Sequence, residues 1–280
     1  MVVTAAAVMG AIGLALGVVV GVFAKIFKVG GNPLIELVAE LLPGANCGGC
    51  GKAGCADFAK SVVARENPPA KCPVSTAEQI SAIALAIGVD AGQAEKLRAV
   101  VRCAGDSTQS VRYVNYHGVQ DCTSAALVGG GPKACRYGCL GLGSCARRCP
   151  FGAIEIVNNI AVVHPELCVG CGACVGVCPR GVIALVRADA DVHVYCNSPE
   201  RGTAKRKVCS AGCLGCGKCK RYSEQKFVLD GAPARVNYAA ETLPDASDIA
   251  AIGCPTGVIR STAGQISTET NEPDAVKSNE

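Results

Sequence analysis

The chain has 280 residues, of which 50% are apolar, 4% are aromatic and 20 are cysteines. The formal net charge is +4 with 18% charged residues, a balance that excludes long-range disorder and gives no reason to expect nucleic-acid binding. The mean hydropathy of +0.32 suggests a membrane segment. Cysteines this dense indicate disulfides in a secreted protein or metal ligands in an intracellular one.

Residues 1–28 predict a single transmembrane helix. Residues 1–24 carry no charged side chain, and a helix of that length can cross a bilayer. Lys25 and Lys28 follow the apolar run, so the positive-inside rule places the bulk of the chain on the cytoplasmic side of the inner membrane. A cleaved signal peptide would carry its basic residues before the run. Thiols in the cytoplasm stay reduced, so we expect the cysteines to bind metal.

Residues 29–90 predict a small helical domain that holds one [4Fe–4S] cluster. Asn32 and Pro33 form a cap and a first helical position, and a short amphipathic helix follows them. The next residues include four cysteines with small residues between them, Cys47, Cys50, Cys55 and Cys72. Small residues let a loop fold around a compact cluster and direct N–H groups at its sulfurs. Zinc is the alternative, but structural zinc usually takes two paired hooks of ligands.

Residues 91–134 predict a connecting segment, and residues 135–187 predict a two-cluster ferredoxin domain. The spacing Cys-x2-Cys-x2-Cys-x3-Cys-Pro from Cys168 to Cys178 is that of bacterial ferredoxins, in which the fourth cysteine ligates the neighbouring cluster. A variant of this run lies upstream. The two crossed ligand sets are therefore predicted to be Cys135, Cys139, Cys145 and Cys178, and Cys168, Cys171, Cys174 and Cys149. Residues 154–157 and 160–163 predict a hairpin between the two runs.

Residues 188–260 predict a third ferredoxin-like module with an insertion. A Cys-Pro-x-Gly-x-Ile pattern begins at Cys149, Cys178 and Cys254, which makes it an internal repeat. In the third copy Ser223 occupies the place of the fourth cysteine, and the next Cys-Pro follows an insertion of more than 30 residues. We expect one cluster on four cysteines of this module, Cys213, Cys216, Cys219 and Cys254.

Four cysteines remain that no spacing groups: Cys103, Cys122, Cys196 and Cys209. Four clusters use 16 thiols and a fifth would use all 20, so counting predicts five [4Fe–4S] clusters, of which at least three rest on motifs. Four free buried thiols are the alternative. A two-iron cluster, or an exchange of partners with Cys213, also fits the sequence.

The charge of the loaded protein is expected to differ from that of the apoprotein. Each [4Fe–4S]²⁺ core with four thiolates carries about −2, so five clusters would turn +4 into about −6. Ten basic residues flank the cluster motifs: Arg136, Arg147, Arg148, Arg180, Lys205, Arg206, Lys207, Lys218, Lys220 and Arg221. They either compensate cluster charge, dock an acidic carrier protein, or form an ordinary solvated surface.

Motifs typical of catalytic sites are absent from the sequence. His117, His164 and His193 share no spacing and predict ordinary surface or turn residues. The chain has neither a nucleotide-binding motif nor a nucleophile–base pair, so no catalytic residue is assigned. Residues 261–280 are polar and predict a disordered tail.

The apolar N-terminus, followed by NPLIELVAELLPGANCGGCGKAGC and GPKACRYGCLGLGSCARRCPFGAI, resembles the B subunit family of the Rnf complex. That complex is a membrane-bound, ion-translocating ferredoxin:NAD⁺ oxidoreductase. The resemblance covers nearly the whole chain. Ser223 and the insertion before Cys254 depart from the family pattern and leave the ligands of the third module open.

The resemblance implies an α+β polyferredoxin that relays electrons between soluble ferredoxin and the membrane machinery. It implies further Rnf subunits as partners, which carry the flavins, the NAD site and the ion path. The chain would then be an enzyme only as part of the complex. A generic membrane polyferredoxin that serves a hydrogenase or another reductase is the first alternative. A structural zinc protein at the membrane is the second, and a brown colour would exclude it.

Overall fold

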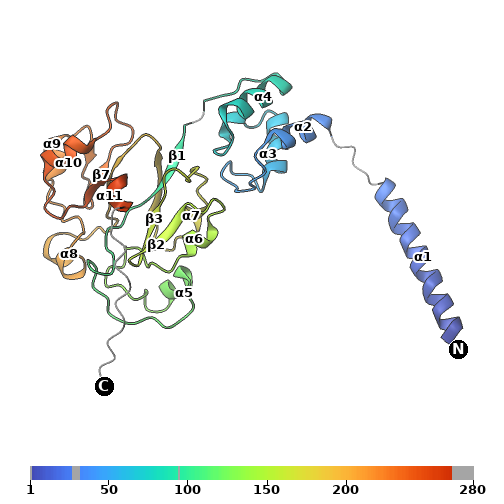
Figure 1. The fold of residues 1–280 in the computed structure, drawn as a ribbon, viewed down its shortest axis with the longest axis horizontal. Coiled ribbons are helices and arrows are strands. Elements are labelled where there is room, and N and C mark those ends of the chain that lie inside the picture. The colour runs from blue at the N-terminus through green and yellow to red at the C-terminus, as the bar shows by residue number, and fades with distance from the viewer. Residues whose placement is uncertain (1, 27–31, 94, 267–280) are drawn as a thin grey trace.

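The computed structural model describes residues 2–26, 32–93 and 95–266 (Figure 1). Helix α1 (Val2–Ile26) projects away from the other elements in this view. Many of its large apolar side chains between Val8 and Phe23 are exposed. None of the helices in the described ranges is both long and apolar enough to cross a membrane.

A small helical domain follows, as the sequence predicted. Asn32 caps its first helix, where the side-chain oxygen accepts a hydrogen bond from the backbone N–H of Leu34 at 3.0 Å. The apolar faces of the helices meet in a core that includes Val38, Phe58 and Ile83. Its elements are α2 (Pro33–Leu41), α3 (Cys55–Val63), the 3₁₀ turn η1 (Pro69–Lys71) and α4 (Ala77–Ile87).

The central part combines short helices with two antiparallel strand pairs. The predicted hairpin is confirmed: β2 (Ile154–Val157) pairs with β3 (Ile160–Val163), and both residues of the Asn158–Asn159 turn have positive φ. The second pair joins β1 (Leu97–Val101) to the distant β4 (Ile183–Arg187). The expected connecting segment therefore supplies a strand, together with helix α5 (Cys122–Leu127). Helices α6 (Ser144–Arg148) and α7 (Ala173–Val177) contact each other beside the strands.

The C-terminal part carries the insertion and closes on a long-range strand pair. Strand β5 (Val192–Val194) pairs with β8 (Ile259–Ser261), and β6 (Phe227–Val228) pairs with β7 (Arg235–Val236). The helices are α8 (Gly202–Val208), α9 (Lys218–Tyr222), α10 (Ala246–Ile252) and α11 (Thr262–Ile266).

The expectation of a disordered tail from residue 261 is wrong for its first six residues. Ser261 ends β8, and in α11 the side chains of Thr262 and Gln265 are buried. The backbone N–H of Thr262 donates to the carbonyl of Asp191, which ties this segment to β5. Polar composition misled the prediction because the buried hydroxyl of Thr262 finds a partner inside the fold and donates to the carbonyl of Asp191 at 3.0 Å. Residues 267–280 lie outside the described residues.

Cysteines belong to the apolar cores of the molecule. Four separate clusters of buried apolar residues occur in the described chain, and each of them includes at least one cysteine. The largest fully buried rings are those of Tyr195, Phe58 and Phe227. The cores are otherwise built mainly from small aliphatic side chains and thiols, in agreement with the low aromatic content.

Candidate metal-cluster sites

Four hollows in the structure are each lined by four cysteines. We name them the Cys168 site, the Cys145 site, the Cys103 site and the Cys213 site. Their cysteines are, in the same order, Cys149, Cys168, Cys171 and Cys174; Cys122, Cys139, Cys145 and Cys178; Cys103, Cys135, Cys196 and Cys209; and Cys213, Cys216, Cys219 and Cys254.

The Cys168 site has the crossed arrangement expected from the ferredoxin spacing. Cys149 comes from the end of α6, whereas the other three cysteines lie in and before α7. The left-handed conformation of Gly172, with φ 77°, begins α7 between two of these cysteines. The backbone N–H of Ala99 on β1 donates to the sulfur of Cys168 at 3.3 Å. Thus β1 contributes directly to the surroundings of this site.

The Cys145 site differs from the predicted grouping in one member. Cys122 lines the cavity in the place that the sequence assigned to Cys135. Its backbone N–H donates to the Ser144 hydroxyl at 2.8 Å, and that hydroxyl donates to Asp121 at 2.7 Å. These bonds hold the start of α5 against the start of α6. A contact between two separate helices leaves no trace in cysteine spacing, which explains why the spacing predicts a different grouping.

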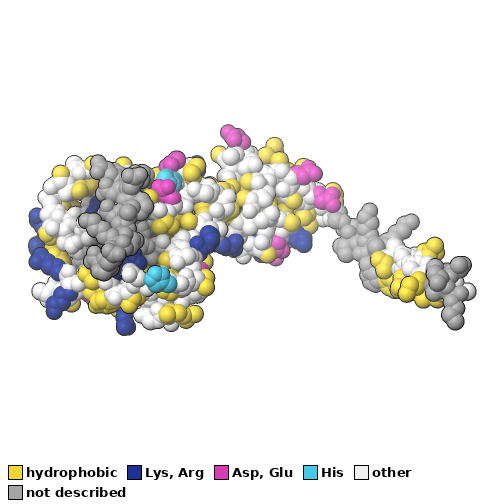
Figure 2. All heavy atoms as spheres, turned by 60° about the horizontal axis from the view of Figure 1, so that its bottom comes forward, with side chains coloured by type: hydrophobic (Ala, Val, Ile, Leu, Met, Phe, Trp, Pro, Cys, Tyr) yellow, Lys and Arg dark blue, Asp and Glu magenta, His cyan; other side chains and the backbone are white. Residues whose placement is uncertain are grey.

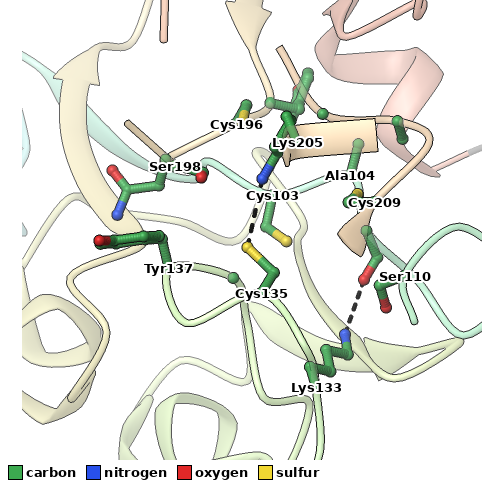
Figure 3. Close-up of a pocket in the computed structure, with 16 residues that line it drawn as sticks. Cys103, Ala104, Ser110, Lys133, Cys135, Tyr137, Cys196, Ser198, Lys205 and Cys209 are labelled. Atoms are coloured by element: carbon green, nitrogen blue, oxygen red, sulfur yellow. Dashed lines mark hydrogen bonds between the residues drawn. The ribbon is translucent and has the colours of Figure 1, made fainter. Parts of the chain in front are cut away.

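The Cys103 site gathers the displaced Cys135 with three of the dispersed cysteines (Figure 3). Cys103 follows β1, Cys196 follows β5, and Cys209 follows α8. The backbone N–H of Ala104 donates to the carbonyl of Tyr195 at 3.0 Å, which brings the ends of β1 and β5 together. The predicted fifth set therefore exchanges Cys122 for Cys135, while its other three members lie together.

The Cys213 site brings together the four cysteines predicted for the third module. Helix α9 begins at Lys218, directly before Cys219. Gly253 caps the end of α10 and directly precedes Cys254. The insertion therefore returns the chain to the module, and Cys254 rather than Ser223 lines the cavity. Backbone N–H groups of Thr256, Val258 and Ile259 outweigh the effect of burial and lower the pKa of Cys254.

The N-terminal set, named the Cys47 site, also converges within one domain. Cys50 and Cys72 are buried in the same core, and Cys55 packs against them at the start of α3. Burial raises the pKa of Cys47, and the charges of Cys171 and Cys72 raise it further. Cys47 is thus near both its own set and the Cys168 site.

Glycines at the Cys103 site leave the space that a cluster would need. A Cβ on Gly105 would lie 3.2 Å from the sulfur of Cys209 and 3.7 Å from that of Cys103. A Cβ on Gly138 would lie 3.5 Å from the sulfur of Cys135 and 3.6 Å from that of Cys103. Methyl groups here would fill the hollow between the thiols. Four thiols around such a hollow match the ligand set of a [4Fe–4S] cluster.

Four buried thiols at these sites favour the neutral form until metal binds. Burial raises the pKa of Cys139 and Cys174 to about 12, and nearby cysteines raise it further. The pKa values of Cys145 and Cys209 are raised to about 11, also mainly by burial. Metal binding must therefore displace protons from these thiols.

Two buried lysines line the Cys103 site, and only one of them was singled out from the sequence. Lys205 is 1% exposed, and its ammonium lies 3.4 Å from the sulfur of Cys135. Burial opposes the charge of Lys205, but the neighbouring cysteines outweigh burial and raise its pKa. Lys133 is 3% exposed and was missed, because nothing in its local sequence predicts that a lysine is buried there.

The other basic residues that flank the motifs are at least partly exposed. Of the ten singled out, all of which lie in the described ranges, only Lys205 is buried. Figure 2 shows Lys and Arg side chains gathered over the C-terminal elements on the left, and several acidic side chains over the helical domain.

Within residues 2–26, 32–93 and 95–266, no three His, Cys, Asp or Glu side chains are close enough together to bind one metal ion.

Comparisons with known proteins agree with the cysteine geometry. Residues 42–74 match an Fe-S cluster family model, and residues 161–184 match the 4Fe-4S binding domain. The B subunit of an ion-translocating oxidoreductase complex from Methanosarcina acetivorans is 44% identical over 77% of this chain and 82% of its own length.

Two further relatives are B subunits whose names give the coupling ion of their complex. The B subunit of a proton-translocating ferredoxin:NAD(+) oxidoreductase complex from Clostridium ljungdahlii is 45% identical over 74% of this chain and 73% of its own length. The B subunit of a Na(+)-translocating ferredoxin:NAD(+) oxidoreductase complex from Acetobacterium woodii is 39% identical over 74% of this chain and 62% of its own length.

Cysteine sets on short helices and strands, together with the two matched domains, define an iron–sulfur protein of the ferredoxin class. The identity to the Methanosarcina and Clostridium proteins extends over most of both chains. The chain belongs to the family of B subunits of ion-translocating oxidoreductase complexes, the Rnf complexes.

Proposed function

We propose that this chain is the iron–sulfur electron-transfer subunit of an ion-translocating ferredoxin:NAD⁺ oxidoreductase. The observation that carries the proposal is the succession of cysteine sets from Cys47 to Cys254 in a chain of this family. The protein acts within an oxidoreductase complex and makes or breaks no substrate bond by itself. Its partners are a soluble ferredoxin and the other subunits of the complex.

All 20 cysteines are proposed as ligands of five [4Fe–4S] clusters. The Cys47 site would hold one cluster on Cys47, Cys50, Cys55 and Cys72, and the four cavities would hold one each. When bound, the clusters supply one-electron oxidation and reduction. The chain supplies the thiolates, buries twelve of the 20 cysteines away from water, and fixes the order in which the sets follow each other in space.

Contacts between neighbouring sets support a continuous row. A Cβ on Gly49 of the Cys47 loop would lie 3.0 Å from the Cys171 backbone. Cys174 of the Cys168 site is close enough to raise the pKa of Cys145. The backbone N–H of Cys139 donates to the sulfur of Cys103 at 3.4 Å. Residues 211 and 212 line the Cys103 site directly before the Cys213 site begins.

A single-pass anchor in the inner membrane, with the cysteine sets on the cytoplasmic side, completes the proposal. It is supported by the uncharged residues 1–24, by Lys25 after them, and by the exposed apolar side chains of α1. Deletion of residues 2–26 should release the chain from membranes washed with alkaline carbonate, and its retention there would refute the anchor.

The test of the electron-transfer function is the cluster content of the anaerobically purified complex. We expect about 20 irons and as much acid-labile sulfide per chain, with dithionite bleaching the brown colour. About 16 irons would refute the fifth cluster, and a colourless zinc protein would refute the function. Copurification with flavin- and NAD-binding subunits is expected, whereas copurification with a hydrogenase would assign the chain to a different complex.

A further inference from the structure

Lys205 places a positive charge inside the wall of the Cys103 site. It lies on α8, it is 1% exposed, and its ammonium is 3.4 Å from the sulfur of Cys135. Figure 3 shows the side chain directed toward Cys135. Gly212 lies against the lysine stem, and a Cβ there would collide with the Cε atom of Lys205. The position of the ammonium is thus set by close packing.

Lys133 adds a second buried charge to the same wall. Its ammonium donates to the carbonyls of Gly105 and Asn159 at 2.8 Å each. Among the residues that line the cavity, none is acidic. Neither lysine has an ion pair with a carboxylate in the described parts of the chain. Backbone carbonyls and thiols are therefore the groups that face both charges.

The other three cavities lack this feature. The Cys168 site is lined by cysteines, glycines and apolar residues, with no charged side chain among its described residues. The Cys213 site has Lys218, which is exposed to solvent, and the Cys145 site has the half-buried Arg180. Water and salt screen exposed charges, whereas a buried charge acts through a low local dielectric. Among the described lining residues of the four cavities, only those of the Cys103 site include fully buried lysines.

We propose that Lys205, assisted by Lys133, gives the Cys103 site the highest reduction potential of the four cavities, so that it holds electrons longest. The inference rests on the proposed function, because it requires a [4Fe–4S] cluster on these cysteines. Reduction adds one electron to the bound cluster and oxidises a ferredoxin donor by one electron. No bond forms or breaks in this step. The added negative charge is stabilised most where buried positive charge is nearest.

The test is a redox titration of the purified complex followed by electron paramagnetic resonance. Lys205→Met should lower the reduction equilibrium constant of one cluster at least tenfold, which is about 59 mV for one electron. Lys207→Met is the matched control, since Lys207 is exposed on the same helix and the substitution removes the same charge. Lys207→Met should change the reduction equilibrium constant of every cluster less than twofold. Equal potentials in Lys205→Met and wild type would overturn the proposal.

A second variant moves the charge without removing it. Gly212→Ala should push the Lys205 stem away from Cys135 and lower the same potential by less than Lys205→Met does. If Lys205→Met loses about four irons, the potential of that cluster cannot be measured in this variant, and Gly212→Ala becomes the test. A wild-type potential in Gly212→Ala would then overturn the proposal.

The iron content of the wild type separates the two proposals. About 20 irons with an unshifted potential would defeat only the role of Lys205. About 16 irons, together with a Cys135→Ala variant that loses no signal, would defeat the fifth cluster itself.

Discussion

His193 illustrates how a residue of unremarkable sequence context becomes buried. The sequence predicted a surface or turn position, but the ring is fully buried and its Nδ1 lies 2.9 Å from the hydroxyl of Tyr238. Burial, and then the nearby Arg98, lower its pKa to about 4. The long-range pairing of β5 with β8 covers the ring, and no local pattern around His193 predicts that pairing.

The buried His193 predicts a loss of stability in mild acid. The unfolded chain takes up a proton near pH 6.5 and the folded chain only near pH 4, so the free energy of unfolding falls as the pH drops between these values. The full effect is about 3 kcal/mol. In His193→Asn the fall in Tm between pH 7 and pH 5 should be smaller than in the wild type.

The exposed His117 provides the control for this experiment. His117→Asn should keep the pH dependence of the wild type. An identical fall in Tm for His193→Asn and wild type would show that His193 does not cause the acid sensitivity.

At the scale of secondary-structure elements, the sequence predicts what is local. The hairpin β2–β3, the capped helix α2 and the crossed set of the Cys168 site all rest on residues that are near in sequence or on a known spacing. The pairings β1–β4 and β5–β8 join segments that are far apart, and they bring together the ends that carry Cys103 and Cys196. The sequence therefore counts the dispersed cysteines but does not show which of them lie together.

The regrouping of Cys122 and Cys135 is testable by cysteine substitution. Cys122→Ala and Cys178→Ala should remove the same paramagnetic signal and about four irons each. Cys135→Ala should remove a different signal, the one that Cys103→Ala also removes. Loss of one common signal in Cys135→Ala and Cys178→Ala would instead support the grouping predicted from spacing.

At the scale of the whole molecule, the helical domain meets the ferredoxin-like part through a glycine. A Cβ on Gly49 would lie 2.8 Å from Pro73 and 3.0 Å from the Cys171 backbone, which cannot easily move. Gly49→Ala should therefore weaken this contact by about 1–3 kcal/mol through overpacking. The magnetic coupling between the reduced clusters of the Cys47 and Cys168 sites should decrease, as pulsed electron paramagnetic resonance can measure.

Gly176 provides the matched control, because it lies on α7 beside the same contact and a Cβ there would meet nothing within 4 Å. Gly176→Ala should leave the coupling at the wild-type value. A coupling in Gly49→Ala equal to that of the wild type would show that the two parts do not depend on this contact.

The charge of the whole molecule should change sign on loading. The sequence has an isoelectric point of about 8.2, and five clusters would turn the net charge of +4 into about −6. Native isoelectric focusing under anaerobic conditions should place the loaded protein below pH 7 and the apoprotein above it. A loaded protein that focuses near the sequence value would contradict the number of clusters.

The wide separation in sequence of the cysteines of the Cys103 site also affects the order in which the cysteine sets can form. The first and last cysteines of this site lie more than 100 residues apart, whereas the Cys47 set is complete by residue 72. Closing so long a segment costs more chain entropy than closing a short one, and synthesis delivers the N-terminal part first. Iron–sulfur assembly factors would thus find the Cys47 set ready early and the Cys103 set only after α8 has emerged. Biogenesis would then proceed from the first set toward the last.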